Sequence, residues 1–410
     1  MDPMISAASD ALSKGDPLAA LKRIALRDDP PALALRGIAM AQLGDLARAL
    51  ELLRRAARAF GPRAPLPRAR CAVAEAEIAL VLRDLGGTLQ TLQKAYAVLD
   101  AYGDRTNAAH AGYLEARHLL LIGRLDEAER VLDAIDAGQL PGVSQVGYQL
   151  VRAGIAIRQV RSGPARAALE PARLAAEAAR IPSLQAEVEQ AVQAFHAPTA
   201  RLVGRDVERL LALEEVERLF ASETLVVDAC RNVVRAGGKV VSLSTRPVLF
   251  ALVRALAAEW PGDVARETLL NQAFGARHAD ESHRARLRVE IARVREAIKP
   301  LATLRATRRG FVLQPHAEAE VGVLTPPVES DYGKVLALLS DGEAWSSSAL
   351  ALALNVSPCT VQRALEELAN LGKVEAQGRG RARRWITSGV PDSRQACCSP
   401  LRSFPVRIGP

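Results

Sequence analysis

Aromatic residues are scarce in this sequence, at 4% of the chain, and cysteines are few. The five cysteines are Cys71, Cys230, Cys359, Cys397 and Cys398. No two of them form a CxxC pair, and the histidines form no HExxH motif, so no metal site is expected. Scattered cysteines in a chain of 410 residues indicate a reducing compartment.

Long apolar runs are missing as well. No apolar stretch approaches the ~18 residues that a membrane-spanning helix needs, so no membrane partner is expected. Residues 1–6 show no basic segment followed by an apolar run, which argues against a signal peptide. These absences together predict a cytoplasmic protein.

Motifs for nucleotide binding and for catalysis are also absent. There is no GxxxxGK[ST] phosphate loop. Before Arg205 there is no alternation of strands and helices of the kind that builds a receiver domain. No pairing of a nucleophile with a base emerges. We therefore expect neither an enzymatic activity nor a cofactor, and no switching driven by ATP or GTP.

The residues that dominate are Ala, Leu and Arg, all strong helix formers. Hydrophobic residues make up 49% and charged residues 24%, as in an ordinary globular protein. The length suits about two to four domains. The formal net charge is +8, and arginines cluster towards the C-terminus. This charge permits nucleic-acid binding without proving it.

Small residues recur at fixed offsets between Pro17 and about Val203, where the apolar period is helical. The pattern is found at Gly37, Gly44, Ala49, Leu53 and Ala56, with offsets of 7, 5, 4 and 3, and again at Ala116, Gly123, Ala128 and Leu132. Weaker matches lie at Ala156, Gly163, Ala168 and Ala175, and at Ala79 and Gly86. Small residues at these offsets let two antiparallel helices pack closely.

This spacing resembles the tetratricopeptide repeat. The resemblance implies that residues 1–203 form an α-α superhelix of about four helical hairpins. Such arrays commonly bind a peptide or partner protein on their concave face. The alternative is a helical bundle that serves as a scaffold for a homodimer. Residues 204–223 follow with an amphipathic pattern that predicts a connecting helix.

At Leu225 the period changes, and residues 224–316 predict a mixed domain. Three short strands are expected at 225–228, 232–235 and 239–243. Helices are expected after Ser244, from about Arg266 to Phe274 and from about 280 to 298. A β-hairpin with a basic tip then covers residues 303–313. This order resembles the OmpR/PhoB-type winged helix, which implies that the third helix enters the major groove of double-stranded DNA and that the hairpin is its wing.

The expected DNA-binding residues of this domain are basic or polar and lie on the third helix and the hairpin. They are Arg284, Arg286, Arg288, Arg293, Arg305, Thr307, Arg308 and Arg309. Ala285, Glu290 and Ala292 depart from the family pattern, so fewer direct base contacts are expected. The alternative is a solvated helix face whose arginines pair with Asp280, Glu281 and Glu296.

Residues 317–330 are expected to form a Pro-containing linker, and 331–388 a second, smaller domain. Helices at 332–339, 346–354 and 357–371 precede two strands around an arginine-rich turn. This order resembles the compact winged helix of bacterial repressors and replication initiators. The expected DNA-binding residues are Ser357, Thr360, Gln362, Arg363, Arg379, Arg381, Arg383 and Arg384. The alternative is a winged helix used for protein contacts. Residues 389–410 are expected to be disordered.

The sequence thus predicts a mainly α-helical protein with N-terminal tetratricopeptide-like repeats and two winged-helix domains of the α+β type. The expected function is that of a one-component transcriptional regulator, in which the repeats sense a ligand or partner protein and the winged helices bind DNA. The alternative is an adaptor whose winged helices contact proteins.

Overall fold

The computed structural model describes residues 2–204, 208–274, 281–316, 319–327, 332–339, 344–378 and 383–387. Within these ranges the chain is mainly helical, with eighteen α-helices and three small sheets. It forms two compact units. One contains residues 1–159, 163–194 and those from 334 onward, and the other contains 160–162 and 195–333. No helix in the described ranges is long and apolar enough to cross a membrane.

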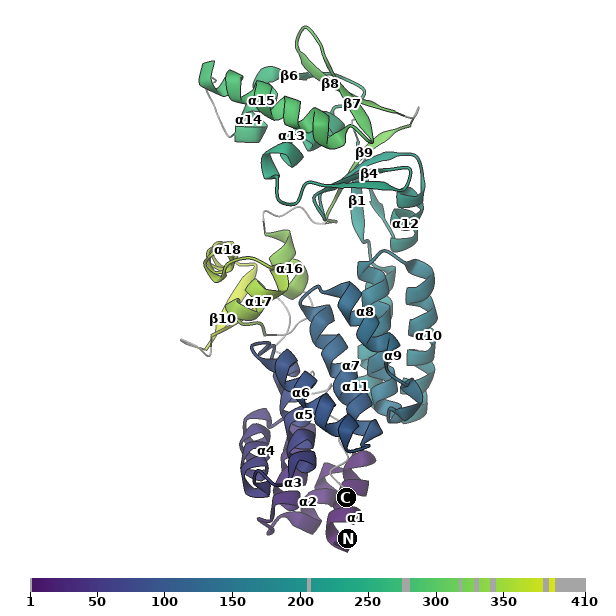
Figure 1. Ribbon diagram of the computed structural model, residues 1–410, viewed down its shortest axis with the longest axis vertical. Coiled ribbons are helices and arrows are strands. Elements are labelled where there is room, and N and C mark those ends of the chain that lie inside the picture. The colour runs from purple at the N-terminus through teal and green to yellow at the C-terminus, as the bar shows by residue number, and fades with distance from the viewer. Residues whose placement is uncertain are drawn as a thin grey trace. The chain divides into compact units, whose positions relative to one another are not determined.

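Residues 3–196 are helical almost throughout (Figure 1). The helices are α1 (Pro3–Ser13), α2 (Pro17–Ile24), α3 (Pro30–Gln42), α4 (Leu46–Phe60), α5 (Pro65–Val81), α6 (Thr88–Ala101), α7 (Arg105–Leu121), α8 (Leu125–Asp133), α9 (Gly142–Arg158), α10 (Ser162–Ala179) and α11 (Pro182–His196). Helices α1 to α8 pack in consecutive pairs. The first pair lies within the expected range of 1–203 but before Gly37, where the pattern of small residues begins.

Small residues of the repeat pattern do allow close helix packing. A Cβ atom added at Gly37 of α3 would lie 2.8 Å from Cγ of Leu53 in α4, so the two helices approach there as only glycine permits. Gly44 and Gly123 turn the chain between paired helices, with φ angles of +88° and +76°. Gly163, which belongs to one of the weaker matches, does not lie between helices but is the second residue of α10.

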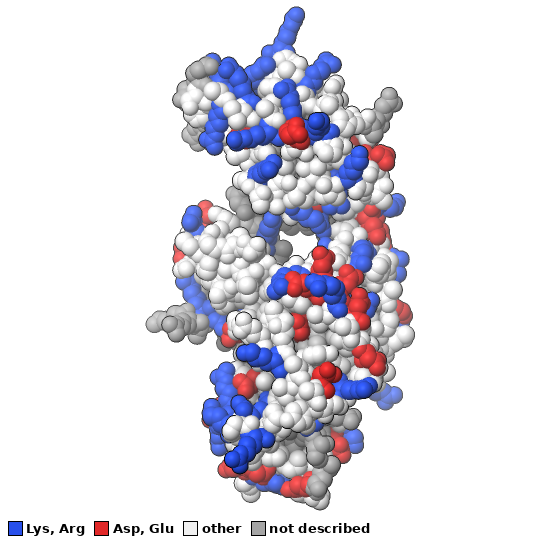
Figure 2. Space-filling view, viewed as in Figure 1, with Lys and Arg blue, Asp and Glu red and all other residues white. Residues whose placement is uncertain are grey.

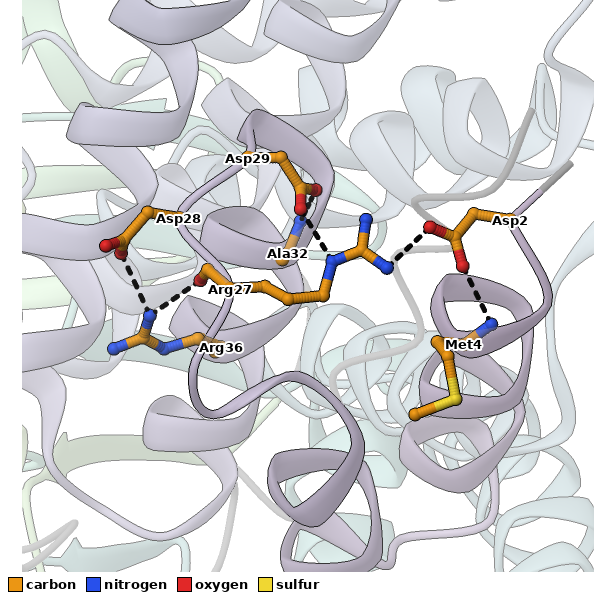
Figure 3. Close-up of polar contacts among 7 residues, drawn as sticks. All are labelled: Asp2, Met4, Arg27, Asp28, Asp29, Ala32 and Arg36. Atoms are coloured by element: carbon orange, nitrogen blue, oxygen red, sulfur yellow. Dashed lines mark hydrogen bonds and ion pairs between the residues drawn. The ribbon is translucent and has the colours of Figure 1, made fainter.

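The N-terminal helices are joined by an arginine (Figure 3). Asp2 caps α1 by accepting from the Met4 amide, and Asp29 caps α3 by accepting from the Ala32 amide. The Arg27 guanidinium donates to both caps, to Asp29 at 2.6 Å and to Asp2. Because the carboxylates lie at helix N-termini, they also interact favourably with the helix dipoles. Two helices are thereby tied through a single side chain.

A six-stranded sheet with the order β2-β1-β9-β3-β4-β5 forms part of the second unit. Its strands are β1 (Ala200–Val203), β2 (Glu208–Leu211), β3 (Leu225–Asp228), β4 (Val233–Ala236), β5 (Lys239–Ser242) and β9 (Val321–Thr325). Strand β9 pairs with β3 in parallel and with β1 antiparallel. Every residue of β9 is buried. Long-range pairing therefore places it in the middle of the sheet.

This sheet corrects three expectations. The helical region expected to reach Val203 ends at His196, and β1 follows it. The expected connecting helix at 204–223 is in part the strand β2, and only α12 (Leu213–Ala221) is helical. The expected linker at 317–330 contains β9. Strands β1 and β9 pair with each other over a long stretch of sequence, whereas β2 pairs with β1 just before it. The local sequence pattern contains neither pairing.

The three expected helices and the hairpin between Ser244 and Pro315 are present. They are α13 (Pro247–Ala258), α14 (Arg266–Phe274), α15 (Glu281–Ile298), β7 (Ala302–Ala306) and β8 (Gly310–Pro315). A short strand, β6 (Val264–Ala265), pairs with β8 to give the order β6-β8-β7. The apolar stripe of α15, with Leu287 and Val294 at its centre, is buried in the core of this part.

The last part of the chain also has the expected elements. They are α16 (Gly333–Leu339), α17 (Ser347–Leu354), α18 (Pro358–Asn370), β10 (Val374–Gln377) and β11 (Arg384–Thr387). Asn355, with a φ angle of +53°, turns the chain from α17 into α18. Trp345 and Trp385 are buried and joined by a β-bridge. The tail expected to be disordered, residues 389–410, lies outside the described residues.

Candidate nucleic-acid interface

The arginines of α15 lie on both flanks of its buried stripe. Arg284 and Arg288 are exposed on the flank that faces the β7–β8 hairpin, and both line a pocket there. Arg286 and Arg293 are exposed on the other flank. Since the helix cannot turn without exposing its apolar stripe, the position of each arginine is fixed by the hydrophobic core.

The pocket between α14, α15 and the hairpin has a volume of about 510 Å³ and is open to solvent. Its lining includes Ala265, Arg266, Glu267, Leu270, Arg284, Leu287, Arg288, Arg309 and Phe311. Four of these residues are arginines and one is a carboxylate. An open pocket with this charge suits an anion.

Arg266 fixes the hairpin against α14. Its two Nη atoms donate to the carbonyls of Arg308 at 3.0 Å and of Thr307 at 3.2 Å. The guanidinium also lies 5.3 Å from the centre of the Phe311 ring. Arg266 was not among the residues expected from the sequence to form the interface. Its position at the start of the expected second helix marks it only as a basic residue. Its hydrogen bonds to residues 41 and 42 positions later in the chain cannot be predicted from its neighbours in the sequence.

The turn of the hairpin is held by Thr307. Its hydroxyl donates to Asp263 at 2.6 Å and accepts from the Gly310 amide at 2.9 Å. The Thr307 hydroxyl, expected at the DNA, is therefore occupied by the protein itself. A Cβ atom at Gly310 would lie 1.8 Å from the Val264 carbonyl oxygen, so the turn passes β6 as closely as glycine allows.

Three arginines of the hairpin project into solvent. Arg305 is exposed on β7, and Arg308 and Arg309 are exposed at the turn. Arg309 is 3.8 Å from Asp263, but its side chain is 74% exposed. The hairpin therefore presents cations on a short, fixed turn beside the pocket.

On the far flank of α15 the contacts are different. Arg286 lies over the Phe274 ring, 4.5 Å from its centre. Arg293 pairs with Glu290 at 2.8 Å, and the Glu290 side chain is only 12% exposed. Of the carboxylates in the alternative interpretation, Asp280 and the side chain of Glu281 lie outside the described structure, while Glu296 is exposed.

Charge is concentrated in this part of the chain. Residues 281–316 contain nine Lys and Arg residues against three Asp and Glu residues. Figure 2 shows Lys and Arg gathered over the region of α14, α15 and the β7–β8 hairpin, where few acidic residues are visible. Asp and Glu are more frequent over the helices that precede it. The basic surplus of the sequence is thus locally concentrated.

In the last part of the chain, the residues expected to bind DNA are less uniform. Ser357 caps α18 and its hydroxyl lies 2.8 Å from that of Thr360, so the two polar groups contact each other. Gln362 and Arg363 are exposed on the same helix.

The arginines of the β10–β11 turn are described only in part. Arg383 is exposed and lies 4.3 Å from the centre of the Trp385 ring. Arg384 is half-buried in β11 and donates to the Arg383 carbonyl. Arg379 and Arg381 lie outside the described residues.

Within the described ranges no three of His, Cys, Asp and Glu lie close enough together to hold a metal ion. What α15 and the β7–β8 hairpin offer is positive charge and hydrogen-bond donors. The comparisons with known proteins add no family to this picture: no protein family, no curated protein and no solved structure matches the chain.

Proposed function

We propose that the chain is a one-component transcriptional regulator that binds double-stranded DNA. In this proposal residues 224–316 act as an OmpR/PhoB-type winged helix, with α15 in the major groove and the β7–β8 hairpin as the wing. The observation that carries it is the convergence of Arg284 and Arg288 from α15 with Arg309 from the hairpin around one open pocket. Arginines from a helix and from an adjoining hairpin are the kind of side chains that contact backbone phosphates beside a groove.

The other parts have supporting roles in this proposal. The N-terminal helices form a tetratricopeptide-like array that binds a protein or peptide partner. Residues 331–388 form a second winged helix that adds contacts to the same DNA, and the protein works in the cytoplasm. No catalytic step is assigned to any residue.

The experiment is a titration of duplex DNA with the full chain over a range of salt concentrations. The variant replaces Arg284, Arg288 and Arg309 by Ala. Each phosphate contact contributes about 0.9 to the slope of log affinity against log salt, so three lost contacts flatten the slope by about 2.7. A matched control replaces Arg68 and Arg105, which are exposed on α5 and α7, and Arg63, which is exposed between α4 and α5, and removes the same charge. An equal loss in both variants, or an affinity that does not respond to salt, would refute the proposal.

A second function is favoured by one observation in the last part of the chain. Leu352, Val356 and Leu371 are exposed to 45%, 42% and 63% around α18. Apolar side chains at the helix that should meet DNA suit a protein partner better than phosphates. The second function is therefore an adaptor, in which residues 331–388 dock to a protein. It predicts that removing arginines from this part leaves DNA affinity unchanged.

A further inference from the structure

The outward face of α15 carries a row of small apolar side chains. Ala285, Val289 and Ala292 follow one another at intervals of four and three residues, which is the spacing of one helix face. All three are exposed, Val289 to 50%. The buried stripe that contains Leu287 and Ile291 faces the core. A single exposed valine is ordinary at a protein surface. What distinguishes this row is the set of charged residues on either side of it.

The row is bordered by cations on both sides. Arg284 and Arg288 lie towards the hairpin, and Arg286 and Arg293 lie on the opposite flank. Between Ala285 and Ala292 the helix contains one acidic residue, Glu290. Its carboxylate accepts a hydrogen bond from Arg293, and its side chain is only 12% exposed. The face therefore has an apolar centre between basic edges.

The C-terminal limit of the row is also defined. Glu296 is the next residue on this face, four positions after Ala292, and its carboxylate is exposed. A carboxylate is repelled by phosphates, so the part of α15 suited to DNA is the part that precedes Glu296. Recognition helices place their N-terminal residues against the base edges in the same way.

Only one apolar group is offered by base edges in the major groove, the C5 methyl of thymine. Alanine and valine side chains cannot donate or accept hydrogen bonds, and a methyl group is the feature that they can select. We propose that Val289, with Ala285 and Ala292 beside it, recognises thymine methyl groups. This inference rests on the proposed function, because it requires α15 to lie in the major groove.

The test compares thymine with deoxyuridine, which pairs identically but lacks the methyl group. A duplex is first selected from a random pool by the full chain, and each thymine is then replaced in turn. We expect one or two replacements to weaken binding by about threefold to fourfold, the effect of exposing one buried methyl-sized group. In Val289→Ser, which removes both methyl groups and leaves a polar hydroxyl, the same replacements should lose most of their effect. Val240→Ser is the matched control, because Val240 is 55% exposed on β5 and is no part of α15; it should respond as the wild type does.

The outcomes separate the two proposals. A chain that binds its selected duplex but responds to no deoxyuridine overturns this inference alone, as does a Val289→Ser variant that keeps the full response. A chain that selects no duplex at all overturns the proposed function and this inference together.

Discussion

Arginine side chains at the candidate interface have two different roles: some bind backbone carbonyls of the protein, and others are exposed to solvent. Arg266 donates to two carbonyls of the hairpin turn, and Arg295 donates to the Leu304 carbonyl at 3.0 Å, so both hold the protein together. Arg309 is largely exposed beside the pocket. A count of basic residues in the sequence does not distinguish these roles. The distinction depends on which backbone carbonyls the fold brings within reach.

His118 of α7 predicts a dependence of stability on pH. Burial, together with the charge of Arg124, lowers the pKa of its imidazole from about 6.5 to about 4. The folded state therefore binds this proton less readily than the unfolded state. The contribution to stability is complete above pH 6.5 and is lost as the pH falls towards 4, at about 1.4 kcal/mol per pH unit at most.

The measurement is the free energy of urea unfolding between pH 4 and pH 7, for the wild type and for His118→Leu. The variant removes the buried titrating group, so its stability should fall less steeply in this range. His196→Gln is the control, because His196 is exposed on α11 and should leave the wild-type slope unchanged. Identical slopes for His118→Leu and the wild type would contradict the assignment.

Helices and hairpins whose formation depends on neighbouring residues were predicted from the local sequence pattern. The stripe of Leu287, Ile291, Val294 and Ile298 has a helical period, and α15 follows it. The basic turn between two short β-prone runs became the β7–β8 hairpin. Strand β9 was missed because its partners β1 and β3 are far away in the sequence. The four residues of β2 have a helix-like pattern, but they pair with β1, the strand just before them in the chain.

The β6–β8 contact gives a prediction about the hairpin. In Gly310→Ala, the new Cβ would overlap the Val264 carbonyl oxygen, so β8 must move away from β6 and the hairpin must shift. We expect weaker DNA binding and a lower melting temperature. Gly163→Ala is the matched control, because no atom lies within 4 Å of its added Cβ and it lies in a helix. Alanine there should be neutral or stabilising by about 0.5–1 kcal/mol. Equal DNA affinity of Gly310→Ala and the wild type would show that the position of the hairpin does not matter.

In the whole molecule, the structure differs most from the sequence-based expectation at the domain boundaries. Strand β1 follows the helical region directly, and β9 lies within the expected linker. Both belong to one sheet, where they pair with each other. A fragment meant to contain the proposed DNA-binding part must therefore begin before Ala200 and extend past Thr325. A later start would leave β9 without one of its neighbours and expose an unpaired edge.

The corrected boundary also limits how far the two parts proposed to bind DNA can separate. Seven residues, 326–332, lie between the end of β9 and the start of α16, so the connection spans at most about 28 Å when extended. This is less than the ~34 Å of one turn of DNA. If both parts bind DNA, they must occupy neighbouring sites, and the linked second site raises affinity through its effective concentration.

Replacing Arg379 and Arg381 by Ala tests this arrangement, because two cations are removed from the sequence between β10 and β11. We expect weaker binding of the full chain and a footprint that is shorter on one side. Protection by α15 and the β7–β8 hairpin should persist, since those elements are unchanged. Arg63→Ala with Arg68→Ala removes equal charge from the N-terminal helices and should leave the footprint intact. An unchanged footprint at unchanged affinity would mean that residues 331–388 do not touch DNA, and their exposed leucines would then favour a protein partner.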